Sequence, residues 1–370
     1  MRKPGIKRQS FRGPLGFALA LAVAIPGAMV FSALNVPLAW MLGPMVFCTL
    51  ASLAGLPLYG YPRLRPLVLS AVGIAIASGV TSDTPADLVH MAPSLVGLFL
   101  CTALSAAVSI LFCLRIARFD LRTAVFSGMP GGLAEMVTLS EHYGADIRRV
   151  SLFHSGRLLF IVLCLPVLMT LGGGLETSTF INDAAVRIAE LSLTEISVLV
   201  AIGVVGAIAG RLIKLPAGHL TGPLLLTAIV RGTETFDVVL PQEPLMLAQL
   251  VIGTVTGAGF AGMPIRELLR ALGLAFASSM ILIVILVVFA LTVSTLLDQD
   301  FRILVLSYSQ GGMSESSILA MTLSAEVTVV ALHHVSRLLF VLFGVALVLR
   351  IMGVAPLRSP PSRGDGGDGA

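Results

Sequence analysis

The sequence predicts an all-α membrane protein that crosses the bilayer many times and is built from two homologous repeats. Hydrophobic residues make up 56% of the chain and charged residues only 12%, and the mean hydropathy is +0.97. Soluble domains carry roughly 25% charged residues, so this composition favours a membrane protein. Apolar runs such as 92–114 and 268–297 are long enough to cross a hydrocarbon core of about 30 Å.

An internal repeat organises these runs. When the sequence is shifted by 180 residues, 120–160 aligns with 300–340 without a gap, and 16 of the 41 positions are identical. Ionisable residues within membrane segments are costly and usually functional, so the duplicated stretch predicts the functional site. Its repeated polar and glycine positions are Asp120/Asp300, Arg122/Arg302, Ser127/Ser307, Gly131/Gly311, Gly132/Gly312, Glu135/Glu315, His154/His334 and Arg157/Arg337.

Taken in order, the chain is expected to hold two membrane repeats with polar segments around them. The parts are a basic cytoplasmic tail at 1–14, repeat 1 at 15–171, a polar connector at 172–193, repeat 2 at 194–352 and a disordered tail at 353–370. In the first repeat, spans are expected at 15–34, 37–55, 66–80, 92–114 and 147–171. The stretch 121–144 is less apolar and carries the interruption Pro130-Gly131-Gly132.

Small residues inside the spans lead to two further predictions. The Gly43-Pro44 and Gly222-Pro223 pairs are expected to break their helices, because proline removes a backbone hydrogen bond. The glycine-rich stretches that begin at Gly73 and Gly253 are expected to let neighbouring helices pack closely.

The distribution of Lys and Arg decides between two topologies. If 121–144 and 301–324 enter and leave on one side, each repeat has five spans and the repeats are inverted. If they cross, each repeat has six spans and the repeats are parallel. With a cytoplasmic N-terminus, the five-span topology places 19 of the 24 Lys and Arg inside and 3 outside, against 16 and 6 for the alternative. Since Lys and Arg favour the cytoplasmic side, we predict inverted repeats with both termini cytoplasmic.

Each Gly-Gly pair is predicted to interrupt a helix at membrane depth. Non-helical backbone is tolerated there only inside protein or beside a wet cavity. The helix that follows such a break points its N-terminus inwards, where its unpaired N–H groups favour an anion. Gly131 and Gly132, with Gly311 and Gly312, are therefore candidate binding residues.

The charged candidates are Glu135, His154 and Arg157 and their counterparts Glu315, His334 and Arg337. Each His and Arg are three residues apart, so they share a helix face. The arginine keeps its charge and needs a carboxylate, a carbonyl or an anion. Two interpretations remain open. Either each Glu pairs with an Arg inside the protein, or the arginines bind an anionic substrate while the glutamates carry protons or hold a cation. The histidines are proton relays or hydrogen-bonded packing residues.

The other polar positions predict smaller roles. Asp120 and Asp300 are expected to cap helices and to form surface ion pairs with the arginines two residues later. Ser127, Ser307 and Ser309 are candidate pocket residues. No cofactor or metal site is predicted, because the four cysteines are scattered singly and only two histidines are adjacent.

The stretches Pro130–Met136 and Gln310–Ser316, together with the later segments at 154–160 and 333–340, resemble the membrane AbrB family. The resemblance covers both repeats and implies an integral protein of the bacterial inner membrane. Members of that family are labelled as regulators of gene expression or as ammonia monooxygenases. The second copy departs from the pattern at Gln310 and Ser316, where the first has Pro and Met, so a milder second break is expected.

Three classes of function follow. The first is a secondary transporter or exporter of a small anionic solute, working by alternating access between the repeats. The alternative is a membrane-embedded sensor that regulates gene expression without touching nucleic acid, because the chain has no extended basic reading element. A membrane monooxygenase is third, since metal ligands are not clustered, and we expect no enzyme activity. The predicted partners are a small molecule or ion and the lipid bilayer; the sequence leaves homo-oligomer formation open.

Overall fold

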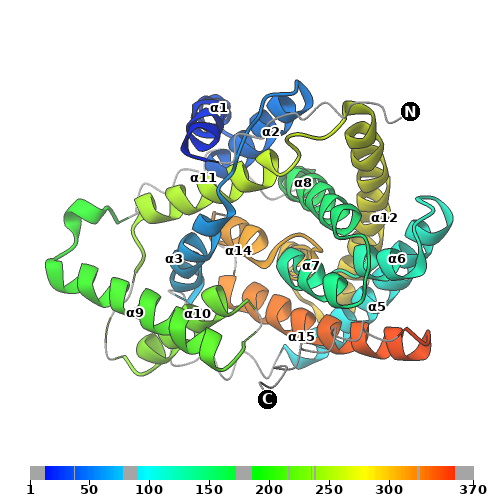
Figure 1. Ribbon diagram of the computed structural model, residues 1–370. Helices are drawn as coiled ribbons and strands as arrows, with labels where there is room; N and C mark the ends of the chain where they lie inside the picture. Colours follow the sequence, from blue (N-terminus) through cyan, green and yellow to red (C-terminus); the bar gives the residue numbers. More distant parts are fainter. Residues whose placement is uncertain are drawn as a thin grey trace, which may run out of the picture.

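The computed structural model describes residues 13–36, 38–77, 91–171, 186–215, 217–234, 236, 239–322 and 326–354. Within these residues all regular secondary structure is helical, which confirms the predicted fold class (Figure 1). The predictions for the N-terminal tail, for most of the connector and for the C-terminal tail concern 1–12, 172–185 and 355–370, which lie outside the described residues.

The described helices vary widely in length. In chain order they are α1 (Pro14–Ala33), α2 (Ala39–Leu53), η1 (Pro62–Leu64), α3 (Arg65–Ala77), α5 (Ala92–Arg115), α6 (Leu121–Gly128), α7 (Leu133–His142), α8 (Ile147–Leu171), η3 (Ile188–Glu190), α9 (Leu193–Leu212), α10 (Gly218–Gly232), α11 (Gln242–Ala258), α12 (Ile265–Leu297), α13 (Phe301–Tyr308), α14 (Met313–Thr322) and α15 (Val327–Ile351).

Six of the described helices are long and apolar enough to cross a membrane: α1, α5, α8, α9, α12 and α15. The other apolar helices are shorter; α2, for example, has 15 residues and α10 also has 15. At a rise of about 1.5 Å per residue, helices of this length cover less than the hydrocarbon thickness. The structure therefore supports a multi-pass membrane protein, and five spans per repeat stays a prediction.

The helices form two bundles that meet along one side. The peripheral bundle contains α1, α2, α3, α9, α10 and α11, and the break-containing bundle contains α5–α8 and α12–α15. In Figure 1 the helices α9 and α10 lie at the left, and α5, α6 and α12 at the right. The two bundles meet where α3 packs against α14 and α15, and where α2 and α11 touch α8.

Glycines let the helices of the peripheral bundle approach closely, as predicted for Gly73 and Gly253. A Cβ atom at Gly73 would collide with the carbonyl oxygen of Leu220, and one at Gly253 with that of Met41. These contacts join α3 to α10 and α2 to α11, so helices from one half of the chain pack on helices from the other half.

The predicted helix breaks at the two Gly-Pro pairs are wrong. Helix α2 continues through Pro44 and α10 continues through Pro223. The reason lies in the packing: Gly43 approaches the backbone of Gly27 on α1, and Gly222 approaches Gly206 on α9. Close packing on two sides holds each helix together although proline removes one hydrogen bond.

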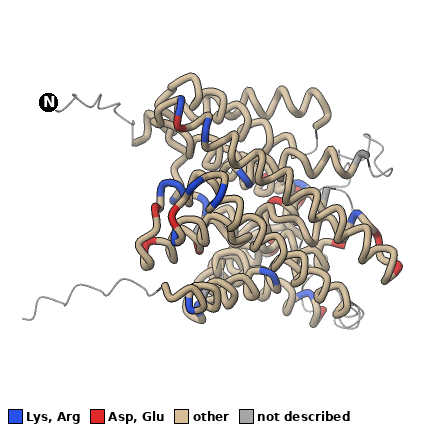
Figure 2. The backbone as a smooth tube through the Cα atoms, turned by 90° about the vertical axis from the view of Figure 1, so that its right-hand side faces the viewer, with Lys and Arg blue, Asp and Glu red and all other residues tan. Residues whose placement is uncertain are grey.

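Charged residues are sparse along the backbone and gather mainly at helix ends and connections (Figure 2). The exceptions that matter lie inside the break-containing bundle. Arg157 and Arg337 are only 2% and 6% exposed, and Glu315 is 2% exposed. These buried charges define the region in which a functional site is to be sought.

Candidate functional site at two helix breaks

Two short pairs of helices, each interrupted after eight residues, form the centre of the break-containing bundle. Helix α6 ends at Gly128 and α7 begins at Leu133; α13 ends at Tyr308 and α14 begins at Met313. Both breaks thus contain four residues, 129–132 and 309–312. The expectation of a milder second break is wrong, because Gln310 interrupts the helix over the same length as Pro130.

The first break leaves carbonyl oxygens at the end of α6 without helical partners, and α8 supplies donors for them. Arg157 Nη2 donates to Met129 O over 3.1 Å, and Nη1 to Gly128 O over 3.5 Å. His154 Nε2 lies 2.8 Å from Phe126 O. The histidine and the arginine, one turn apart on α8, together cap the C-terminus of α6, where cations are favoured by the helix dipole.

The position of His154 also sets its tautomer. Its Nε2 faces a carbonyl and must carry the hydrogen, while Nδ1 lies 2.8 Å from Arg157 Nη2 and must accept. A second proton on Nδ1 would point at the guanidinium group. This geometry favours the packing interpretation of His154, as a neutral group that orients Arg157, over a proton relay.

The second break is capped in the same manner. Arg337 Nη1 donates to Ser309 O, and Nη2 donates to Gly311 O over 3.4 Å. His334 Nε2 lies 3.0 Å from Leu306 O in the last turn of α13. Unlike His154, however, His334 has no hydrogen-bond partner at Nδ1 among the described residues. An unfilled acceptor therefore remains beside the second break.

The two glutamates cover the opposite sides of the breaks. Glu135 and Glu315 stand in the first turns of α7 and α14, where the helix dipole favours a negative charge. Each carboxylate folds back over the preceding glycine: a Cβ atom at Gly132 would collide with Glu135 Oε2, and one at Gly312 with Glu315 Oε2. The second glycine of each pair is needed because it has no Cβ atom, which leaves room for the carboxylate. It is not needed for its backbone angles, since Gly132 has an ordinary φ of −67°.

The ion pairs considered from the sequence are Glu135–Arg157 and Glu315–Arg337, or the crossed pairs of the same residues. None of them is among the salt bridges of the described residues. The arginines and glutamates instead neutralise opposite helix ends at each break. The carboxylate of Glu315 lies 4.0 Å from Arg65, at the start of α3. The alignment of the two halves does not point to Arg65, because Leu245 stands at the equivalent position, 180 residues later.

Each break packs against the long helix of the other half of the chain. A Cβ atom at Gly311 would meet Ile161 and Val162 of α8, and one at Gly344 of α15 would meet Met129. Helices α8 and α15 carry Arg157 and Arg337, so each break lies against the helix that caps the other break.

Several buried polar atoms around the second break lack hydrogen-bond partners among the described residues. They are Ser307 Oγ, both side-chain polar atoms of Gln310, Glu315 Oε1, Ser317 Oγ and His334 Nδ1. At the first break, the unpaired atom is Ser127 Oγ, which corresponds to Ser307 Oγ. Ser309 Oγ, at the second break, has a partner: it lies 2.6 Å from Ser316 Oγ. Buried polar groups without partners are costly, so this concentration is what a site for a polar ligand would show.

The entrances of the two segments carry the predicted caps. Asp120 accepts a hydrogen bond from Thr123 N over 3.2 Å, and Asp300 accepts one from Arg302 N over 2.7 Å. The surface ion pair is present at Asp300–Arg302, with a distance of 2.7 Å; Arg122 instead donates to Tyr143 O. The hydrogen bond from the Arg302 side chain lowers the pKa of Asp300.

The fold and the site together define a multi-pass helical membrane protein with two charge-compensated helix breaks. The comparison with protein families agrees: residues 40–353 match the family described as "Transition state regulatory protein AbrB". The chain therefore belongs to the AbrB family. Among the described residues, no group of three or more His, Cys, Asp or Glu side chains is arranged to hold a metal ion.

Two relatives match over most of their length. The chain is 29% identical over 333 residues to a protein of Escherichia coli (strain K12) named "Putative regulator AbrB", covering 89% of this chain and 94% of the relative. It is 26% identical over 347 residues to the "Uncharacterized protein YhjN" of Bacillus subtilis (strain 168), covering 87% of this chain and 89% of that protein.

Proposed function

We propose that this protein is a secondary transporter of a small anionic solute that binds between the two helix breaks. The observation that carries the proposal is the pair of buried arginines. The hydrogen bonds described above occupy three N–H donors of Arg157 and two of Arg337, and a guanidinium group has five. Among the described residues, donors therefore remain on both groups for an anion, and an anion bound by both arginines would offset the repulsion between their positive charges.

The arrangement of the bundles supports transport. Each bundle combines helices from both halves of the chain, and the bundles meet mainly through α3 with α14 and α15. Inverted repeats in an inner membrane, with both termini cytoplasmic, would let the break-containing bundle move against the peripheral one and expose the site to either side in turn. The salt bridge between Arg65 and Glu315 lies on that boundary, where it would form and break during such a cycle.

The test is flux into proteoliposomes that contain the purified chain. Acetate, lactate, phosphate and sulfate are the probe anions, with a pH-sensitive dye and a potential-sensitive dye inside the vesicles. We expect saturable flux of at least one probe that Arg337→Lys removes and that the exposed-site control Arg63→Gln retains. Saturable binding of a probe with no flux would replace the transporter by the sensor, which the word "regulator" in the names of the family and of one relative favours.

The inverted topology has its own test. Single cysteines at Asp146 and Glu326, in a background without the four native cysteines, would be labelled with a membrane-impermeant thiol reagent. Both positions are exposed and lie just before α8 and α15. Labelling from opposite sides is expected. Labelling from the same side would contradict inverted repeats and, with them, the alternating-access mechanism.

A further inference from the structure

A cavity of about 470 Å³ lies outside the two breaks, between the ends of three candidate membrane spans. It is bounded by the turn after α5, by the first turns of α8 and by the first turns of α12. Four arginines and two carboxylates line it, so its net charge is positive. The mechanism proposed above uses none of these residues, and the cavity is therefore a separate feature.

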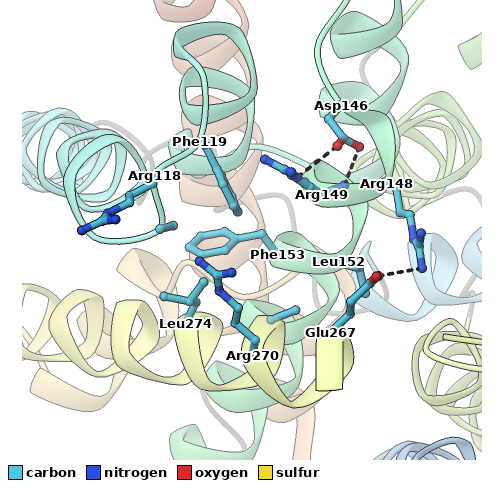
Figure 3. Close-up of a pocket in the computed structure, with 12 residues that line it drawn as sticks. Arg118, Phe119, Asp146, Arg148, Arg149, Leu152, Phe153, Glu267, Arg270 and Leu274 are labelled. Carbon is cyan, nitrogen blue, oxygen red and sulfur yellow. Dashed lines mark hydrogen bonds and ion pairs between the residues drawn. The ribbon is translucent and has the colours of Figure 1, made fainter. Parts of the chain in front are cut away.

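Two of the four arginines are already paired within the cavity (Figure 3). Arg149 bonds to Asp146 over 3.1 Å, and Arg148 bonds to Glu267 over 3.1 Å. The other two, Arg118 and Arg270, have no ion pair or hydrogen-bond partner among the described side chains. In Figure 3 the head of Arg270 lies beside the Phe153 ring, and Arg118 lies apart from it at the left. The unpaired positive charge of the lining is thus carried by these two arginines.

The backbone conformation of the turn after α5 does not require a positively charged residue at Arg118. Arg118 has a φ of +56°, in the left-handed region where glycine or asparagine is usual. The turn after α12 has the same conformation at Asp298, with a φ of +51°. Lys214 after α9 also has a φ of +56°, so turns of this type carry either charge in this chain and leave the charge of Arg118 available to a ligand.

The rest of the lining is apolar and aromatic. The rings of Phe119 and Phe153 lie 6.1 Å apart in an edge-to-face arrangement, and Arg149 stands 5.6 Å above the Phe119 ring. Leu152 and Leu274 complete the apolar part. A ligand that fits this cavity combines a negative group for the arginines with an apolar portion for the rings.

We infer that this cavity binds a phosphate group through Arg118 and Arg270, with the apolar part of the same ligand against Phe119 and Phe153. The N-terminal ends of α8 and α12 border the cavity and add to the attraction for an anion. Phosphate chemistry at the ends of membrane spans is offered both by the headgroups of anionic phospholipids and by soluble phosphate esters. The inference does not depend on the transport proposal.

The test compares wild-type protein with the double variant Arg118→Gln/Arg270→Gln in nanodiscs. The control variant Arg63→Gln/Arg266→Gln removes the same charge from exposed arginines that do not line the cavity. One arm exchanges phosphatidylcholine for phosphatidylglycerol; the other keeps phosphatidylcholine and adds phenyl phosphate, a soluble phosphate ester with an apolar ring. The readouts are the thermal unfolding temperature and, for the lipid arm, the number of phosphatidylglycerol molecules retained in native mass spectrometry.

We expect one of the two ligands to stabilise the wild-type protein saturably. The affinity should fall by about fivefold for each arginine removed, and the control variant should behave as wild type. Glu267→Gln, which frees Arg148, should raise the affinity. A response in the lipid arm alone identifies a phospholipid, and a response in the soluble arm identifies a phosphate ester. No response in either arm, or an equal loss in the control variant, would overturn the inference.

Discussion

The two helix breaks have the same glycine, glutamate, histidine and arginine residues but differ in the residues packed around them. Both have a Gly-Gly pair, a folded-back glutamate and a His–Arg cap on the preceding half-helix. Around the first break, Met129 and Met136 lie in an apolar cluster. At the equivalent positions around the second break stand Ser309 and Ser316, which are fully buried. The repeated residues thus build the break, and the residues that are not repeated determine how polar it is.

This difference in polarity suggests different roles for the two breaks. The first break has an apolar surrounding in which Met129 and Met136 are packed, and Ser127 Oγ is the atom there that lacks a hydrogen-bond partner among the described residues. The second break carries unpaired polar atoms in its wall and a carboxylate beside Arg65. We therefore place most of the ligand contacts at the second break and regard the first as its support.

The largest effects are expected from the arginines, which are common to both breaks. Arg157→Ala and Arg337→Ala should each abolish flux or ligand binding. Even Arg→Lys should cost about 1.5–3 kcal/mol for each charge-assisted hydrogen bond that lysine cannot reproduce. Flux in proteoliposomes and ligand-dependent thermal shifts measure this. Full activity in both alanine variants, with the fold intact, would rule out an anion site at the arginines.

Exchanging the equivalent residues Met136 and Ser316 between the two breaks tests the comparison directly. Ser316→Met gives the second break the residue of the first and should reduce flux by at least about tenfold, since it replaces a hydroxyl and fills space in the polar wall. Met136→Ser makes the reverse change. Because Met136 is fully buried, it should lower the unfolding free energy by about 2–5 kcal/mol with less effect on flux per folded molecule. The opposite result would place the ligand at the first break.

The glycines next to the glutamates provide a smaller, structural test. Gly312→Ala should lower the unfolding free energy by about 1–3 kcal/mol, because its Cβ atom would displace the Glu315 carboxylate. Glu315→Ala should relieve most of that clash. A double-mutant cycle on thermal or denaturant unfolding measures the coupling. Additive effects would show that the carboxylate does not lie on the glycine. Gly273→Ala is the control, since a Cβ there meets no atom within 4 Å.

Much of the architecture could be predicted from the sequence, and particular residues show why. The span expected at 147–171 coincides with α8, and the Gly-Gly pairs mark both breaks, because hydropathy and helix-breaking residues act locally. The duplication with inversion stays a prediction. The helix breaks predicted at the Gly-Pro pairs are wrong. Helix α2 stays continuous because Gly43 packs on Gly27 of α1, and the local sequence of α2 does not show that contact.

The site was predicted less completely than the fold. Repetition identified the arginines and glutamates, but it could not show that they bind helix ends and not one another. It did not point to Arg65, because Leu245 stands at the equivalent position. Arg65 reaches the site through packing between the bundles, which an alignment of the two halves of the sequence does not show.

The smallest predicted effect concerns the two entrance caps. Asp300 forms an ion pair with Arg302, whereas Arg122 donates to Tyr143 O and leaves Asp120 as a cap alone. Asp300→Asn keeps the cap and removes the charge, so it should cost about 0.5 kcal/mol at this partly exposed pair. Asp120→Asn should cost less.

The pH dependence of the Asp300 contribution follows from its lowered pKa. A carboxyl group with a lower pKa in the folded state stabilises the protein fully above the ordinary aspartate pKa of 3.8, and it loses this contribution as the pH falls through the folded value. Thermal unfolding of wild type and Asp300→Asn in detergent should therefore differ at pH 7 and converge below pH 3.8. High salt should shrink the difference at pH 7. A difference that persists in acid would mean that packing of the side chain, and not its charge, stabilises this entrance.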